Sequence, residues 1–203
     1  MKRLLAVFVL IVASASAYAQ APAILVFGDS ISAGYGLPRE QGWVELLKTR
    51  LQSQGYGYQV VNASVSGETT AGGLARLPRA LELHRPKIVI LELGGNDGLR
   101  ALPIAQMRAN LTQMVTLATA IGAKVLLLGM RMPPNYGPEY TKQFALVFSD
   151  LASEKKIPSV PFLLTDIALS PNLLQGDDIH PNALGQPILL DNVWPTLKPL
   201  LHK

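Results

Sequence analysis

The 203-residue sequence contains no cysteine and only three histidines. The absence of cysteine excludes disulfides, thiolate nucleophiles and thiolate metal ligands. The chain also has no internal repeat, no low-complexity segment and no linker that would divide it. Its 18 basic and 14 acidic residues form no basic stripe, so the charge pattern does not indicate a nucleic-acid partner. We expect one domain with a sizeable core.

Two familiar motifs are incomplete. The segment Gly28–Ser32 ends in serine where the G-x-S-x-G motif has its final glycine. Gly34 and Gly36 lack the third glycine of a dinucleotide-binding fingerprint, and they do not directly join a strand to a helix. Neither motif therefore supports a function here.

The first 19 residues have the layout of a secretory signal peptide. A basic head with Lys2 and Arg3 precedes the apolar run Leu4–Val12 and a tail of small residues ending at Ala19. Cleavage after Ala19 would leave residues 20–203 for the periplasm or the exterior, and loss of two basic residues would lower the net charge from +4 to +2. The alternative is a membrane anchor, but the apolar run is short for a bilayer.

Apolar runs alternate with segments of helical periodicity along the rest of the chain. The runs predict five strands, at Ala23–Phe27, Tyr58–Val61, Ile88–Leu91, Val125–Leu128 and Val160–Leu163. The segments between and after them predict helices near residues 40–54, 70–85, 103–121, 139–155 and 182–194. This alternation predicts a three-layer α/β/α sandwich around a five-stranded parallel sheet.

The first strand stops at a glycine and is followed closely by Ser30. Ligands of open parallel sheets bind at the carboxyl ends of the strands, so Ser30 is a candidate nucleophile. A serine after a strand is also a common turn or cap residue. The catalytic interpretation therefore needs a base, a group that orients the base and an oxyanion site at the same edge.

Polar turns also follow the second and third strands, and they contain Gly67 and Asn96. If the strand order is 2-1-3-4-5, Ser30 lies between these two loops. The backbone N–H groups of Ser30 and Gly67 and the side-chain amide of Asn96 could then donate to one oxyanion. Each residue taken alone is better explained as an ordinary turn residue. Their joint occurrence at the ends of adjacent strands favours the oxyanion interpretation.

The candidate base is found by elimination among the histidines. His84 is expected at a helix end, where a cation is favourable in any case, and His202 is the second-last residue. His180 lies in a compact loop with Asp177 three residues upstream, so the carboxylate could turn back to Nδ1 and leave Nε2 for Ser30. The alternatives are a capping aspartate or a metal site, although there is no second histidine cluster.

Asp177 is followed directly by a second aspartate, Asp178. Two residues three apart in a turn can face one another, so Asp177 is expected to orient His180. Asp178 is expected to be solvated or to cap the next helix.

These segments resemble four sequence blocks of the GDSL, or SGNH, hydrolase family. In order, they are Gly28-Asp29-Ser30, the segment 62–69 with Gly67, Gly94-Gly95-Asn96-Asp97, and the segment 177–181. In the first block, Ser30 is followed by isoleucine, where the family pattern has leucine. The segments 93–100 and 133–137 resemble the subgroup of periplasmic acyl-CoA thioesterases, arylesterases and lysophospholipases.

The resemblance implies a flavodoxin-like fold, a Ser30–His180–Asp177 triad and an oxyanion hole of Ser30, Gly67 and Asn96. It implies ester and thioester hydrolysis through an acyl-enzyme on small-molecule or lipid substrates, without a cofactor. From the sequence as a whole we expect a monomer with no metal, no nucleic-acid partner and no stable membrane insertion. One alternative is a carbohydrate O-acetylesterase of the same superfamily. Another is a noncatalytic binding protein that keeps the fold, against which the complete triad argues.

The loops at residues 97–102 and 131–138 follow the third and fourth strands and should border the site. Their apolar side chains predict an open groove for a medium-length acyl chain. The candidate substrate-binding residues are Leu99, Leu102, Met132, Pro133, Pro134 and Tyr136.

Overall fold

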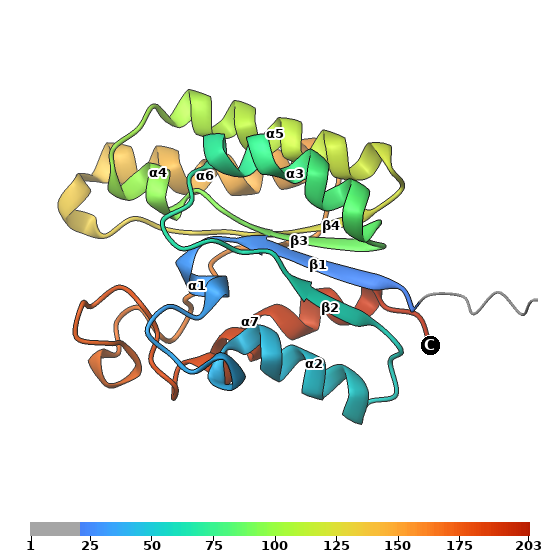
Figure 1. Cartoon of the computed structure of the whole chain (residues 1–203). Coiled ribbons are helices and arrows are strands. Elements are labelled where there is room, and N and C mark those ends of the chain that lie inside the picture. The colour runs from blue at the N-terminus through green and yellow to red at the C-terminus, as the bar shows by residue number, and fades with distance from the viewer. Residues whose placement is uncertain (1–20) are drawn as a thin grey trace, which may run out of the picture.

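Five parallel strands form the central sheet of the computed structural model, which describes residues 21–203 (Figure 1). Their order is β2-β1-β3-β4-β5, as expected from the sequence. The strands are β1 Ala23–Gly28, β2 Gln59–Asn62, β3 Ile88–Glu92, β4 Lys124–Leu128 and β5 Ser159–Val160. The expected signal peptide, residues 1–19, lies outside the described residues.

Helices cover both faces of the sheet, which makes the predicted three-layer sandwich (Figure 1). One face carries α2 Trp43–Ser53 and α7 Gln186–Leu197, and the other carries α3 Thr70–His84, α5 Ile104–Ala120 and α6 Pro138–Lys155. Because both faces are covered, every residue of β1 and β3 is buried, and their sequences show no polar alternation. The largest fully buried side chains are Trp43, Phe27, Phe144 and Phe148.

Two very short helices that sequence periodicity does not reveal begin at the carboxyl edge of the sheet. α1 (Ser30–Ala33) follows β1, and α4 (Gly95–Leu99) follows β3. β1 pairs with both β2 and β3. The turns after these three strands therefore meet at one edge. The remaining elements are 3₁₀ turns: η1 Arg39–Gln41, η2 Pro134–Tyr136, η3 Pro171–Leu173 and η4 Lys198–Leu200.

The fifth strand is shorter than the sequence predicted. It ends at Val160 instead of Leu163 because Pro161 has no N–H for the sheet. Gly129 donates to the Val160 carbonyl over 2.7 Å and accepts from Leu163 N–H over 2.8 Å, so the chain stays beside the end of β4 in irregular form. Residues 161–170 then form a loop at the carboxyl edge of the sheet.

The last helix begins four residues later than expected. The side-chain oxygen of Asn182 accepts hydrogen bonds from the N–H groups of Leu184 and Gly185 over 2.9 and 3.3 Å. This local turn competes with helix, so α7 starts at Gln186. The helix continues through Pro195 to Leu197. Within residues 21–203, no helix combines the length and apolar character needed to cross a membrane.

Candidate active site

Ser30 is the first residue of α1, and only Asp29 separates it from the end of β1. Asp29 caps this helix, because its Oδ1 accepts from the N–H of Ile31 over 3.0 Å. The turn depends on Gly28, where an added Cβ would lie 2.5 Å from Oε2 of Glu92 and 2.8 Å from its carbonyl oxygen. The sharp end of β1 thus delivers a half-buried serine hydroxyl to the edge of the sheet.

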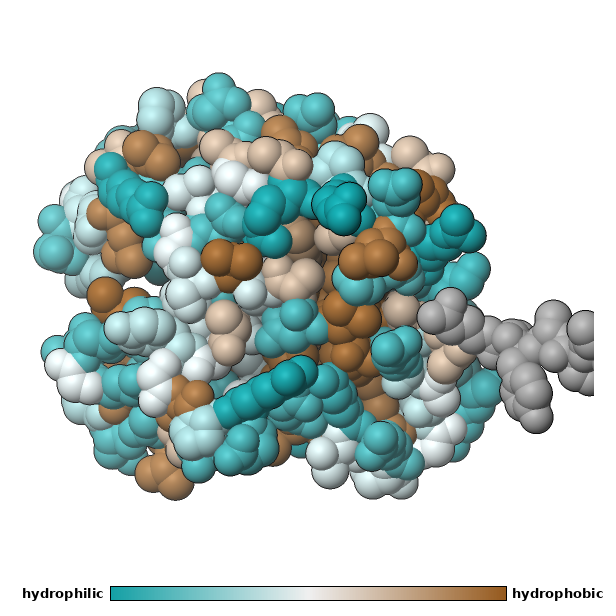
Figure 2. All heavy atoms as spheres, in the orientation of Figure 1, coloured by the Kyte–Doolittle hydropathy of each residue, from teal (hydrophilic) through white to brown (hydrophobic). Residues whose placement is uncertain are grey.

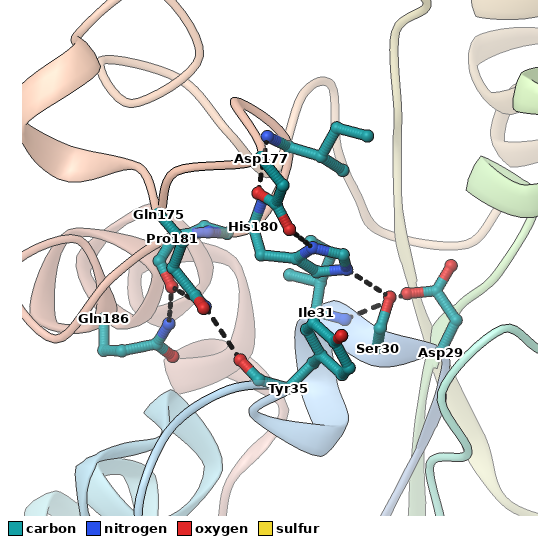
Figure 3. A network of polar contacts seen from close by, with 10 residues as sticks. Asp29, Ser30, Ile31, Tyr35, Gln175, Asp177, His180, Pro181 and Gln186 are labelled. Carbon is teal, nitrogen blue, oxygen red and sulfur yellow. Dashed lines mark hydrogen bonds and ion pairs between the residues drawn. The ribbon is translucent and has the colours of Figure 1, made fainter.

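Ser30 and His180 are 150 residues apart in the chain, but their side chains meet (Figure 3). The distance from Ser30 Oγ to His180 Nε2 is 2.9 Å. On the other side of the imidazole, Nδ1 lies 2.6 Å from Oδ2 of Asp177. The ring of Tyr35 packs against the imidazole at a centroid distance of 4.6 Å. The three polar side chains therefore form the continuous line that nucleophile activation requires.

Asp177 is held in place by its own turn. Its Oδ1 accepts from the backbone N–H groups of Ile179 and His180, each over 3.0 Å. Partial burial alone would raise the pKa of Asp177, but the hydrogen bonds from His180 and Ile179 outweigh it and lower that pKa to about 2. The carboxyl group is therefore ionised at neutral pH. Asp178 has a positive φ of 57° and lines the neighbouring groove instead of contacting the imidazole.

The other two histidines lie elsewhere. His84 is the last residue of α3, and His202 contacts Nζ of Lys124 over 2.9 Å. Within residues 21–203, no group of three or more His, Asp or Glu side chains is arranged to hold a metal ion.

The candidate oxyanion residues Ser30, Gly67 and Asn96 all line one groove together with His180. Gly67 adopts a φ of 77°, a left-handed conformation that favours glycine, and its carbonyl accepts from Arg100 Nη2 over 3.0 Å. Within residues 21–203, the N–H groups of Ser30 and Gly67 donate to no protein group. The Asn96 amide donates to Oδ2 of Asp29 over 3.0 Å, which leaves its second hydrogen for another acceptor.

The groove has a volume of about 520 Å³, and its lining is mostly apolar. A hollow opens where the strands point, at the left of Figure 2, with apolar side chains at its rim. Of the six residues expected to bind substrate, four line it: Leu99, Met132, Pro133 and Pro134. Leu102 and Tyr136 do not. The Tyr136 hydroxyl donates to the Leu99 carbonyl over 2.9 Å and so supports the loop, whereas Leu102 is 37% exposed outside the groove.

A second wall of the groove was not foreseen from the sequence. It comes mainly from the loop after β5, and its apolar residues are Phe162, Leu164, Ala168, Leu169 and Leu174. Leu169 is 97% exposed. The sequence signal for this wall was the apolar residues that follow the fifth strand at the carboxyl edge of the sheet. Because the predicted strand extended to Leu163, part of this apolar segment was taken as strand instead of loop.

A pair of buried carboxyl groups adjoins the groove: Asp29 is one of its lining residues, and Glu92 accepts a hydrogen bond from the backbone of Asp29. Glu92 is fully buried, and its Oε2 accepts from Ser32 Oγ over 2.7 Å and from Asp29 N–H over 3.2 Å. Burial, reinforced by the charge of Asp29, raises the pKa of Glu92 well above its ordinary value. Burial also raises the pKa of Asp29 to about 6, against the lowering effect of hydrogen bonds from Ile31 and Asn96.

The chain is similar to known proteins over most of its length. The model of the GDSL-like lipase/acylhydrolase family matches residues 26–188. Esterase TesA of Pseudomonas aeruginosa is 55% identical over 183 residues, which are 90% of this chain and 91% of that protein. The Escherichia coli protein named thioesterase 1/protease 1/lysophospholipase L1 is 41% identical over 184 residues, 91% of this chain and 87% of that one.

The fold is also similar to that of a solved esterase structure. The crystal structure of the psychrotrophic esterase EstA from Pseudoalteromonas sp., inhibited by monoethylphosphonate, superposes with a TM-score of 0.84 at 40% identity. The match covers 87% of this chain and 97% of that one.

Proposed function

Because the chain belongs to the GDSL-like lipase/acylhydrolase family, we propose that it hydrolyses carboxylic esters and acyl thioesters through an acyl-enzyme on Ser30. The observation that carries this proposal is the contact of Ser30 Oγ with His180 Nε2 at 2.9 Å, in the wall of an apolar groove. The names of the relatives, an esterase and a thioesterase/lysophospholipase, support both substrate classes.

In the proposed reaction, His180 accepts the hydroxyl proton as Ser30 attacks the carbonyl carbon. The developing oxyanion receives hydrogen bonds from the N–H groups of Ser30 and Gly67 and from the Asn96 amide. The imidazolium is stabilised by the ionised Asp177, and it returns its proton to the leaving alcohol or thiol. Water activated by the same imidazole then hydrolyses the acyl-enzyme.

The acyl group is proposed to lie in the groove between the two apolar walls. One wall carries Leu99 and Met132, and the other carries Leu164 and Ala168. An apolar groove that opens at the surface suits medium acyl chains with loose selectivity. All groups of the site come from one chain, so a monomer suffices. The signal-peptide pattern of residues 1–19 supports action in the periplasm or outside the cell.

The test is turnover of a series of p-nitrophenyl esters from acetate to laurate, together with acyl-CoA thioesters of the same lengths. We expect the highest kcat/KM at intermediate length and measurable turnover of both classes. Strict preference for acetate would favour a carbohydrate O-acetylesterase instead. Absence of turnover across the series would favour a noncatalytic binding protein.

A further inference from the structure

The candidate oxyanion donor Asn96 is itself held by a buried carboxylate. We propose that Asp29 is a positioning residue, which fixes the Asn96 amide so that one of its hydrogens points to the developing oxyanion. The inference rests on the proposed hydrolase function, and it concerns a residue that would not contact the substrate carbonyl itself. It assigns a task to the acidic member of the Gly28-Asp29-Ser30 segment.

The two carboxylate oxygens of Asp29 hold two different elements. Oδ1 accepts from the N–H of Ile31 over 3.0 Å and so fixes α1, which carries the nucleophile. Oδ2 accepts from Asn96 Nδ2 over 3.0 Å and so fixes a side chain of α4, which follows β3. Only 2% of Asp29 is exposed, so water does not compete for these contacts. One side chain thereby sets the nucleophile and the oxyanion donor relative to one another.

The chemistry of the contact removes an ambiguity in the donor. An asparagine side chain can present either its oxygen or its nitrogen in a given direction. Beside a carboxylate, which only accepts, the nitrogen of Asn96 must face Asp29. One hydrogen is then used, and the planar amide group fixes the direction of the other. Gly95 permits this approach, since a Cβ there would lie 3.2 Å from Oδ2 of Asp29.

Glu92 supports the arrangement from behind. Its Oε2 accepts from the backbone N–H of Asp29 and from the hydroxyl of Ser32, while Oε1 has no partner within residues 21–203. Burial and the charge of Asp29 raise the pKa of Glu92 and favour its neutral form, whereas hydrogen bonds from Ile31 and Asn96 favour the ionised form of Asp29. Glu92 thus holds the main chain of Asp29. Both carboxylate oxygens of Asp29 can then accept from Ile31 and Asn96.

The test is a double-mutant cycle between positions 29 and 96 on one p-nitrophenyl ester. In Asp29→Asn, the new amide oxygen can still accept from Ile31 N–H, but the amide nitrogen then faces the Asn96 nitrogen. We expect kcat to fall roughly 10–100-fold with KM nearly unchanged. This is less than the roughly 10²–10³-fold expected for removal of an oxyanion donor, because the Asn96 amide is still present but no longer held in place. In the Asn96→Ala background, the same substitution should lower kcat less than about threefold, because the group it positions is already absent.

Two further variants keep the test decisive. Asp29→Ser retains a good helix cap, but its side chain is too short to reach Asn96, so it should reproduce the non-additivity even if Asp29→Asn folds poorly. Asp97→Asn is the control, because Asp97 is also buried, 3% exposed, but accepts from the N–H and hydroxyl of Thr70. Its effect should be the same in both backgrounds and should appear mainly in the thermal melting temperature.

The outcomes separate the inference from the function on which it rests. A wild-type protein that turns over no ester contradicts the proposed function. An active wild type whose kcat falls equally on Asp29 substitution with and without Asn96, or does not fall at all, overturns only the positioning role. Non-additivity in both Asp29 variants, together with additivity for Asp97→Asn, supports it.

Discussion

Asp177 Oδ2 lies 2.6 Å from His180 Nδ1, although the two residues are only three positions apart in the chain. The turn that brings them together is closed by the other carboxylate oxygen, which accepts from two backbone N–H groups. The same side chain therefore shapes the loop and orients the imidazole. Local sequence alone specifies this half of the proposed triad, whereas the contact of His180 with Ser30 depends on the whole fold.

The first prediction separates the adjacent aspartates. Asp177→Asn should lower kcat roughly 10²–10⁴-fold, because an amide neither enforces the imidazole tautomer nor stabilises the imidazolium. Asp178→Asn should cost less than about tenfold and serves as the matched control. Both are measured as kcat at neutral pH on one p-nitrophenyl ester, with a thermal melt of each variant. A larger loss in Asp178→Asn would show that the assignment is wrong by one residue.

The second prediction concerns the oxyanion. Asn96→Ala should lower kcat roughly 10²–10³-fold with little change in KM, because the amide interacts more strongly with the transition state than with the bound ester. Exposed Asn172→Ala is the control and should leave both constants unchanged. If Asn96→Ala keeps near-normal kcat, Asn96 is only a turn residue of α4.

A third prediction tests the wall of the groove formed by the loop after β5. Ala168→Trp would fill part of the groove, so kcat/KM for p-nitrophenyl laurate should fall at least about tenfold while acetate is turned over normally. Leu184→Trp places the same indole side chain at an exposed position that does not line the groove, and it should change kcat/KM for neither substrate. Equal losses on acetate and laurate in Ala168→Trp would mean that the long chain lies elsewhere.

The fourth prediction concerns stability against pH. In the folded protein, the pKa of Glu92 is raised above its ordinary value of 4.5. At pH values between 4.5 and this raised pKa, the folded state therefore binds more protons than the unfolded state. The contribution of Glu92 to the free energy of unfolding therefore falls as pH rises above about 4.5. The side chain of Glu92→Gln cannot ionise, so this variant does not lose stability in this way as pH rises.

The measurement is the melting temperature of wild type and Glu92→Gln at pH 5 and pH 8. The melting temperature of the variant relative to that of the wild type should be higher at pH 8 than at pH 5. A difference in melting temperature that stays constant would show that Glu92 has the same pKa in the folded and unfolded states.

Much of the site follows from sequence because parallel strands bring their carboxyl ends to one edge. The turns with Ser30, Gly67 and Asn96 could be placed together on that ground, and the structure brings all three to one groove. Strand ends are less predictable, because they depend on which N–H groups find partners. Pro161 ends β5 early for this reason, and the loop that follows supplies a wall of the groove.

Side-chain directions within loops were also beyond the sequence. Tyr136 was expected to line the groove, but its hydroxyl donates to the Leu99 carbonyl. The burial of Glu92 depends on the register of β1 and β3, which pairs it with Gly28. No local pattern distinguishes a buried glutamate at a strand end from a solvated one.

In the proposed reaction, Ser30 forms a covalent acyl-enzyme with the help of His180. The most direct test is intact-mass analysis of the protein after reaction with an alkyl phosphonate ester, followed by peptide mapping, for wild type, Ser30→Ala and His180→Ala. We predict one adduct per wild-type molecule on Ser30, none on Ser30→Ala, slow labelling of His180→Ala, and loss of ester turnover in both variants. An adduct on another residue, or a Ser30→Ala variant that retains wild-type turnover, would contradict the account.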